Sequence, residues 1–397
     1  NDKAQILSGW KNKITLGSPI TLLIQNKDFS IEKLDKVLCP RPGHADLAGL
    51  LKYGFSDIRE VLERASARST ASTVGVGAIC KILLNEFGIK ISSRLLSVGG
   101  QDSKEDIAVK ISEAIAKKDT VGGIFEVKAI GLPVGLGSYA QADRRLDARL
   151  ACGVMSIPGI KAVEIGLGFG YADKFGSKVH DEIVYLKAKG YIRKSNNAGG
   201  IEGGISNGED IILRACMKPI ATLMDPLNSV NIITKKPAKA GIERSDTCVV
   251  ESAGVVAEAV CAFVLAEVFL EKFGNDSLAD IKVSYKNYLM KDGIYSVMNF
   301  PKIEVIGKTG GSPSSAVFSG ILWFKQKLRE SIRNNFSPPQ SSILEGTILG
   351  DNGAMSKDLK DKLNITGLRH IIAVSGTHVV ILSSIIMSFL LVMGFWR

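Results

Sequence analysis

The sequence predicts a globular protein of mixed helical and extended structure, divided into more than one unit. Its 397 residues exceed one average domain and allow two or three. Hydrophobic residues make up 45% and charged residues 23%, which excludes general disorder and a polytopic membrane protein. Amphipathic helical patterns alternate with short β-rich runs along most of the chain.

The first predicted elements are a strand and a capped helix. Residues 19–26 (PITLLIQN) are apolar and rich in β-formers. Residues 103–118 have a helical period, with Ser103 as N-cap and Asp106 completing a capping-box pattern. The face expected to be buried carries Ile107, Ala108, Ile111 and Ile115.

Four further elements follow. Residues 124–130 predict a half-buried strand, 143–157 a helix and 161–166 a short strand. In the first of these, the alternation pairs inward Phe125, Val127 and Ala129 with outward Glu126 and Lys128. Residues 252–273 have the strongest helical pattern, stopped by Gly274. Its expected apolar positions are Val255, Val256, Ala259, Val260, Phe263, Val264 and Ala266.

The C-terminal quarter differs in composition. The net charge is +10, and residues 297–397 contribute half of it with 11 basic and 6 acidic residues. We therefore expect a domain at 1–290, a junction at 291–310 and a separate mainly helical region at 311–397. Residues 379–396 carry no charge and are long enough for one membrane span, with a buried core helix as the alternative.

Several segments carry candidate chemistry. Residues 196–208 contain five glycines within ten residues, which excludes a helix or regular strand and suits close approach to a ligand, or else a surface loop. Residues 64–70 (RASARST) place arginines and hydroxyls at a helix start, either an anion site or a solvated terminus. The six cysteines form no C-x-x-C pair, so we expect no metal site and a reducing cytoplasm.

Two further segments carry titratable groups. His44 with Asp46 nearby could transfer protons near neutrality, although a lone histidine is more often structural. Arg244 and Asp246 stand on alternate residues of an extended segment and point to the same side, as a site or as a surface ion pair.

Six motifs together resemble one family. RPGHAD, RASARST, SIPGIKAVEIG, NNAGGIEGGISNG, KPIATL and RSDTCVV follow the order and spacing of chorismate synthase over about residues 2–288. The resemblance implies an α+β fold, a β-α-β sandwich of antiparallel sheets around central helices, assembled as a homotetramer without nucleic acid. It also implies a lyase of the shikimate pathway, which serves aromatic amino acid biosynthesis. The expected reaction is 1,4-anti elimination of phosphate from 5-enolpyruvylshikimate 3-phosphate to give chorismate, with reduced FMN as cofactor and NADPH only in a bifunctional enzyme.

The resemblance also implies roles for residues of this sequence. His44 would protonate or stabilise the reduced flavin, and Asp246 would assist proton removal at flavin N5. Substrate would meet Arg68 and Arg244. The residues implied to contact FMN are Arg64, Ala65, Ser66, Pro158, Gly159, Gly203, Lys218, Pro219, Ile220, Ala221, Thr222 and Arg244.

The sequence departs from the family at both ends. Ser69 and Glu251 replace the usual Glu and Pro, and a first histidine motif with an arginine-rich segment is not found, so we expect an N-terminally truncated enzyme with poor turnover. Residues 297–397, including AVSGTH, resemble the start of a ComEC-type competence channel. The alternative function is therefore a fragment of a membrane DNA-uptake protein, with the tail inserted in a membrane and the enzyme part as an artefact of fusion or assembly.

Overall fold

The computed structural model describes residues 3–26, 33–186, 190–290, 323 and 326–349. The chain divides into two compact units, Asn1–Pro301 and Lys302–Arg397. The predicted junction at 291–310 and the predicted span at 379–396 lie outside the described residues.

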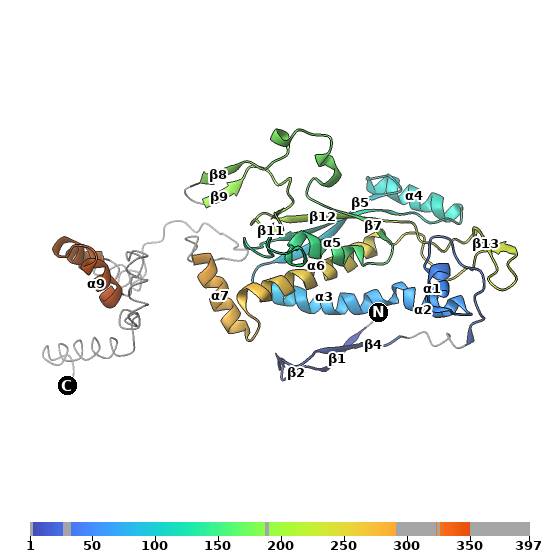
Figure 1. The fold of residues 1–397 in the computed structure, drawn as a ribbon, viewed down its shortest axis with the longest axis horizontal. Helices are drawn as coiled ribbons and strands as arrows, with labels where there is room; N and C mark the ends of the chain where they lie inside the picture. The colour runs from blue at the N-terminus through green and yellow to red at the C-terminus, as the bar shows by residue number, and fades with distance from the viewer. Residues whose placement is uncertain (1–2, 27–32, 187–189, 291–322, 324–325, 350–397) are drawn as a thin grey trace. The chain divides into compact units, whose positions relative to one another are not determined.

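The first unit contains helices and strands in mixed order (Figure 1). The helices are α1 (Asp46–Tyr53), α2 (Ile58–Ala65), α3 (Thr70–Asn85), α4 (Lys104–Ala116), α5 (Leu146–Met155), α6 (Val250–Phe273) and α7 (Leu278–Met290), with short 3-10 turns that include η2 (Ala67–Ser69). The strands are β1 (Ala4–Ser8), β2 (Trp10–Lys11), β3 (Ile14–Thr15), β4 (Thr21–Ile24), β5 (Lys90–Val98), β6 (Gly123–Ile130), β7 (Ile160–Ile165), β8 (Ile183–Leu186), β9 (Gly190–Arg193), β10 (Ile201–Glu202), β11 (Ile205–Ser206), β12 (Ile211–Met217), β13 (Asn228–Val230) and β14 (Pro237–Lys239).

A four-stranded antiparallel sheet in the order β5-β6-β12-β7 forms one layer. Its register places Leu213 of β12 opposite Val127 of β6 and Ile165 of β7. Side chains alternate along each strand, so Val127 and Leu213 share a buried face with Phe125 and Ala215. This buried face of the sheet points towards the helices.

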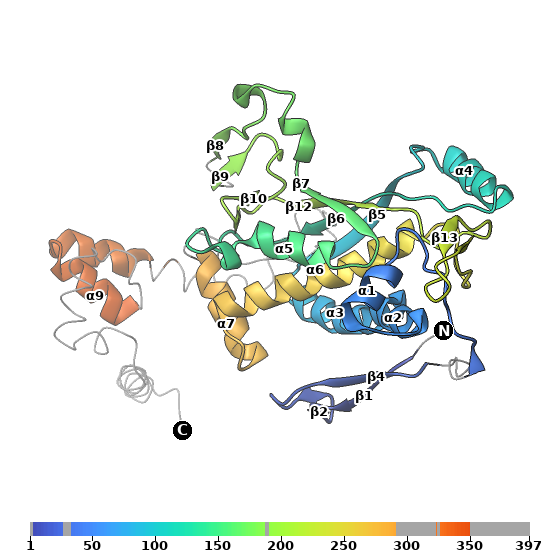
Figure 2. The same cartoon turned by 45° about the vertical axis from the view of Figure 1, so that its right-hand side comes forward.

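Helices α5 and α6 cover one face of the sheet, and α3 packs against α6, which is the central element (Figure 2). A Cβ on Gly77 of α3 would lie 2.4 Å from the backbone Cα of Ala259 on α6, so the two helices touch through their backbones. Among the described residues, α6 is the one helix long and apolar enough to cross a membrane, but much of it is buried in this core.

A small antiparallel pair of strands, β1 and β4, lies on the side of α3 that faces away from α6, as both views show (Figures 1 and 2). A Cβ on Gly75 of α3 would lie 3.4 Å from Leu22 and 3.7 Å from Ile24, both on β4. The predicted strand at 19–26 is confirmed as β4. Mixed helix and antiparallel sheet are thus present, as expected.

The capped helix is confirmed as α4. Ser103 Oγ accepts a hydrogen bond from the Asp106 backbone N–H at 3.1 Å and donates one to the Asp106 carboxylate at 2.7 Å. Two members of its expected buried face are exposed, however, since Ala108 and Ile115 point to solvent. The buried stripe follows Ile107, Ile111 and Ala114 at i, i+4 and i+7 instead.

The helices α5 and α6 and the strand β7 confirm three more predicted elements, and Gly274 ends α6 with a positive φ of 98°. Two of the apolar positions named from the sequence, Val255 and Phe263, are 48% and 51% exposed. Because α6 is apolar on nearly every side, its pattern could not select the face that meets the sheet.

Glu126 also corrects the sequence analysis, because this outward-facing carboxylate is only 4% exposed. It accepts hydrogen bonds from Arg94 on β5 at 2.8 Å and from Arg214 on β12 at 3.1 Å. Arg214 also bonds Glu164 on β7 at 3.1 Å. Four side chains in register across four strands thus form an alternating charge ladder that covers Glu126.

The second unit is described only in part. Residues 326–335 are helical, and α9 spans Gln340–Leu349. The Arg333 guanidinium donates to the nearly fully buried Glu345 carboxylate at 2.7 and 3.0 Å.

Candidate active site

A cavity of about 430 Å³ lies beyond the carboxyl end of β12, where segments distant in sequence meet. The turn from α2 to η2 contributes one wall and the turn between α5 and β7 another. The rest comes from the segment before α1 that holds Arg41 and His44, from residues 217–222, and from residues 243–246 with Val249. The lining residues are Arg41, His44, Leu62, Glu63, Ala65, Ser66, Ala67, Arg68, Pro158, Gly159, Met217, Lys218, Pro219, Ile220, Ala221, Thr222, Glu243, Arg244, Ser245, Asp246 and Val249.

Thirteen of the fifteen residues singled out from the sequence lie in this lining. The exceptions are Arg64 and Gly203. Arg64 is exposed in the last turn of α2, and the chain reaches the cavity only with the following residues. There the Ser66 side chain accepts a hydrogen bond from the Arg68 backbone N–H at 3.3 Å and caps η2.

Gly203 lies far from the cavity, at the other end of β12. It forms a two-residue turn with Gly204 between β10 and β11, with φ of 58° and 84°. This hairpin corrects the expectation that the glycine-rich segment contains no strand. Two consecutive positive φ angles match a type I′ hairpin turn, which explains the glycines without any ligand.

The cavity gathers cationic side chains. Arg68 pairs with Glu63 at 2.8 Å, and Lys218 donates to the Gly43 carbonyl. Burial lowers the pKa of Lys218, and the charges of Lys161 and Arg41 lower it further. A bound anion would relieve this repulsion, so the lining favours an anionic ligand.

His44 belongs to a buried network at the cavity wall. The Asp46 carboxylate is 2.5 Å from His44 Nδ1 and accepts hydrogen bonds from Arg41 Nε at 2.9 Å and Nη2 at 3.1 Å. Burial alone would raise the pKa of Asp46, but hydrogen bonds from His44 and Arg41 outweigh it and hold this pKa far below its usual range. The Arg41 Nη1 donates to Thr222 Oγ1 at 2.7 Å.

Arg41 is the functional candidate that sequence reasoning missed, although it stands in the same RPGHAD segment as His44. Its role depends on burial, because Arg41 is only 7% exposed and an arginine so buried requires a partner, which Asp46 provides five residues later.

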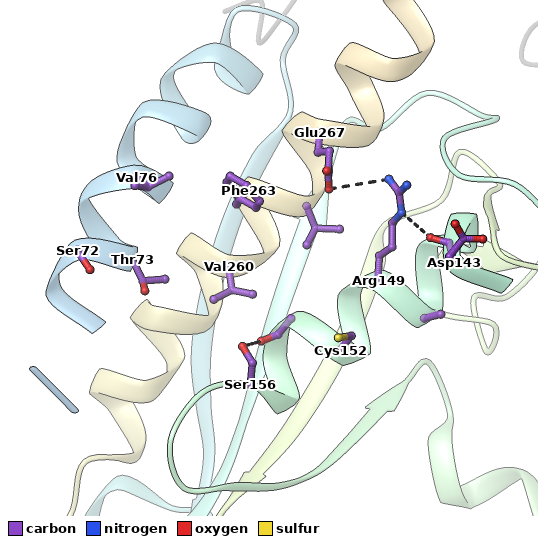
Figure 3. A pocket seen from close by; sticks show the side chains of 13 residues that line it. Ser72, Thr73, Val76, Asp143, Arg149, Cys152, Ser156, Val260, Phe263 and Glu267 are labelled. Atoms are coloured by element: carbon purple, nitrogen blue, oxygen red, sulfur yellow. Dashed lines mark hydrogen bonds and ion pairs between the residues drawn. The ribbon is translucent and has the colours of Figure 1, made fainter. Parts of the chain in front are cut away.

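A larger cavity of about 720 Å³ lies between α3, α5 and α6 (Figure 3). Val76, Val260 and Phe263 line its walls, and Arg149 at its edge pairs with Glu271 at 2.9 Å. None of the site residues predicted from the sequence lines it.

A cavity lined by arginines, a lysine and a histidine, with a buried acid behind the histidine, on a mixed α and β scaffold is typical of an enzyme that handles an anionic ligand. The chorismate synthase family model matches residues 1–270. The chain is 54% identical over 292 residues to chorismate synthase of Thermoanaerobacter pseudethanolicus, covering 73% of this chain and 83% of the relative. It is 52% identical over 291 residues to that of Caldanaerobacter subterraneus subsp. tengcongensis, covering 72% and 83%.

A solved structure agrees with these relatives. The crystal structure of a chorismate synthase matches with a TM-score of 0.61 and 40% identity, covering 73% of this chain and 84% of the other. The chain belongs to the chorismate synthase family. The predicted lyase class is thereby confirmed.

Residues 347–397 match a second family model, described as competence protein. This match confirms the resemblance seen in the tail, but nearly all of it lies outside the described residues. It is short beside the 270-residue match, so a DNA-uptake function for the chain is not favoured.

Proposed function

We propose that the cavity beyond β12 binds reduced FMN and 5-enolpyruvylshikimate 3-phosphate, and that the chain forms chorismate by 1,4-anti elimination of phosphate. The observation that carries this proposal is the meeting of thirteen family-type residues, from segments up to 200 residues apart, around one cavity. A volume of about 430 Å³ falls in the range of small-molecule sites.

The residues present fit such a cofactor chemically. Phosphate requires cations and N–H donors, which Arg68, Lys218 and the turn at Ser66 supply. A flat ring requires small and apolar neighbours, which Pro158, Gly159 and Ala221 supply. Reduced FMN would provide the electron-rich ring that assists loss of phosphate from the substrate.

The protein's own groups would hold the charges and move the protons. Arg68 and Arg244 would bind the anionic substrate, and Lys218 would stabilise negative charge as phosphate leaves. His44 would carry a proton at Nε2, since its Nδ1 faces Asp46. Asp246, which is exposed on the same wall, would accept a proton.

Arg244 provides the sharpest test, because it makes no hydrogen bond or ion pair within the described residues and its loss should spare the fold. We expect Arg244→Ala to weaken reduced FMN or substrate binding by about 1.5–3 kcal/mol, ten- to a hundredfold. The measurement is an anaerobic titration with photoreduced FMN, with and without substrate. Arg144→Ala, an exposed arginine outside the cavity, is the matched control. Equal affinities for wild type and both variants would remove Arg244 from the site.

The remaining family properties are part of the same proposal. We infer a homotetramer, a cytoplasmic enzyme and an enzyme domain at 1–290. Sedimentation of the full chain would test the tetramer, and a mass of one or two chains would contradict it.

A further inference from the structure

We propose that Asp46 is a positioning residue that fixes the tautomer and orientation of His44, so that only Nε2 of His44 meets a ligand in the cavity. The inference rests on the proposed function for the identity of that ligand, but not for the arrangement of the two side chains. It adds to the site a residue that lines no part of the cavity.

Asp46 is built to remain ionised although it is fully buried. It is the first residue of α1, where the helix dipole favours negative charge, and the N-cap residue Ala45 makes no side-chain capping hydrogen bond. Its carboxylate accepts three hydrogen bonds from Arg41, from the backbone N–H at 2.9 Å and from Nε and Nη2. A buried carboxylate with this many charge-assisted donors keeps its charge.

The ionised carboxylate decides where the imidazole proton lies. Two unprotonated acceptors 2.5 Å apart would repel, so a proton stands between Asp46 Oδ1 and His44 Nδ1. Because Asp46 is the stronger acid, that proton belongs to the imidazole. Neutral His44 is therefore the Nδ1–H tautomer, and its Nε2 carries a lone pair.

Arg41 also approaches the imidazole, since its Nη2 lies 3.1 Å from His44 Nδ1. If Nδ1 accepted a hydrogen bond from Arg41, it would carry no proton, and its lone pair would face the Asp46 carboxylate with no proton between them. The shorter contact with Asp46 settles the competition, and Arg41 Nη2 donates to Asp46 Oδ1 instead. Among the described residues, only Asp46 and Arg41 contact Nδ1.

The network also fixes the imidazole against the rest of the cavity. Arg41 donates to Thr222, and Lys218 donates to the Gly43 carbonyl, so the loop before α1 is attached twice to the segment after β12. The other charged groups of the lining are Glu63, Arg68, Glu243, Arg244 and Asp246. These groups can influence the proton on Nε2 through a bound ligand, whereas the proton on Nδ1 is held in the hydrogen bond to Asp46.

The consequence is a one-sided proton relay. Protonated His44 releases the Nε2 proton to a basic atom of the bound ligand, and the N–H bond breaks as the new bond forms. His44 then becomes neutral and keeps its Nδ1 proton, while Asp46 stays anionic throughout. Asp46 holds the geometry and never transfers a proton to the ligand.

The experiment measures the tautomer directly. The chain has four histidines, so ¹⁵N-histidine NMR of the full chain, with His44→Gln for assignment, resolves which His44 nitrogen carries the proton when the ring is neutral. We expect Nδ1–H in the wild type. Nε2–H, or a mixture, in the wild type overturns the proposal without need of any Asp46 variant.

The Asp46→Asn variant extends the test to catalysis. Its amide can donate to Nδ1 and favour the Nε2–H tautomer, so kcat should fall about 10²–10⁴-fold while the affinity for reduced FMN stays near the wild-type value. Glu258→Gln is the matched control, because this partly buried carboxylate on α6 is held by Lys81 and Ser93 outside the cavity. It should change neither kcat nor the tautomer.

The two proposals fail differently. A wild type that binds no reduced FMN contradicts the proposed function and leaves the tautomer measurement valid. A wild type that binds FMN, with an Asp46→Asn variant of unchanged tautomer, overturns the role of Asp46. Unchanged kcat in an active enzyme with a switched tautomer overturns it as well.

Discussion

The two ends of β12 carry two glycine- and arginine-containing regions of opposite character. At its carboxyl end, residues 218–222 enter a cavity in which Arg68, Lys218 and Arg244 gather. At its amino end, polar groups of the β10 and β11 hairpin and of the residue after it are paired with a side chain of the neighbouring strand β9. Arg193 binds the Glu202 carboxylate at 2.8 Å through two nitrogens and the Asn207 carbonyl at 3.0 Å.

The difference teaches which sequence signals indicate a ligand. The ends of a seven-residue strand lie about 20 Å apart, so the hairpin cannot join the cavity of the same chain. The glycines of the hairpin satisfy backbone geometry, whereas Lys218 and Arg244 of the cavity form no ion pair with a carboxylate within the described residues. Unsatisfied charge in a cavity therefore marks a site more reliably than a run of glycines.

The largest expected effect is a loss of folding stability at the amino end of β12, where the hairpin lies. We predict that Gly204→Ala destabilises the fold by about 2–4 kcal/mol, because Gly204 has a left-handed φ of 84° that is strained for alanine and because the new Cβ would overpack the site. It would lie 2.8 Å from the Arg145 side chain and 3.1 Å from the Ser138 carbonyl. Urea unfolding monitored by circular dichroism measures the change.

The neighbouring glycine gives the matched control. A Cβ on Gly203 meets nothing within 4 Å, so Gly203→Ala should cost only about 1–2 kcal/mol, from its φ alone. Folded Gly203→Ala should keep the wild-type affinity for reduced FMN. A loss of FMN affinity without loss of stability would return the hairpin to the site and break the comparison.

The second prediction compares the two ends of β12 by their effect on the affinity for reduced FMN or substrate. Lys218→Ala should weaken reduced FMN or substrate binding by about 1.5–3 kcal/mol, since a cation inside the cavity is lost. Arg193→Ala removes the β9 cation that is paired with Glu202 of the hairpin, and it should leave affinity unchanged while lowering stability. Fluorescence titration of both variants checks this, and the reverse order of effects would contradict it.

The smallest effect concerns the pH dependence of stability beside the hairpin. Burial would raise the pKa of Asp181, but hydrogen bonds from Ser195 and from the Ala198 and Asn197 backbone hold it below its ordinary value. A carboxylate whose pKa is lower in the folded state than in the unfolded state stabilises the fold at pH values above the unfolded-state pKa. This stabilisation is lost as the pH falls through the folded-state pKa.

The unfolding free energy of the wild type should therefore fall between neutral pH and a pH below the unfolded-state pKa of an aspartate, about 3.9. Asp181→Asn should make this fall smaller. Thermal unfolding of both proteins across that range measures it. Asp173→Asn, an exposed aspartate nearby, is the control, and an equal change in both variants would show that Asp181 has no special part.

The sequence predicted the periodic elements well, because α4, α6, β6 and β7 follow local rules of capping and alternation. It failed where the deciding partner is distant. Glu126 is buried only because Arg94 and Arg214 lie opposite it on flanking strands, and the alternation within β6 carries no trace of them.

The candidate site shows the same division. Most of its members were expected from family motifs, and their meeting around one cavity could not be read from local patterns. Arg41 was missed because its role depends on burial, which the motif alone does not reveal. Gly203 was expected at the cavity because the resemblance carried no information on which end of β12 it occupies.

The backbone contact between Gly77 and Ala259 has a consequence for synthesis of the chain. About 180 residues separate these helices, and closing a loop of that length costs about 5 kcal/mol of chain entropy. During translation at about 5–20 residues per second, α3 waits roughly 10–40 s for α6 to be made. Throughout that interval, the side of α3 that packs against α6 lacks this partner, so we expect the ribosome-bound chain to expose it and to be held by chaperones until α6 is made.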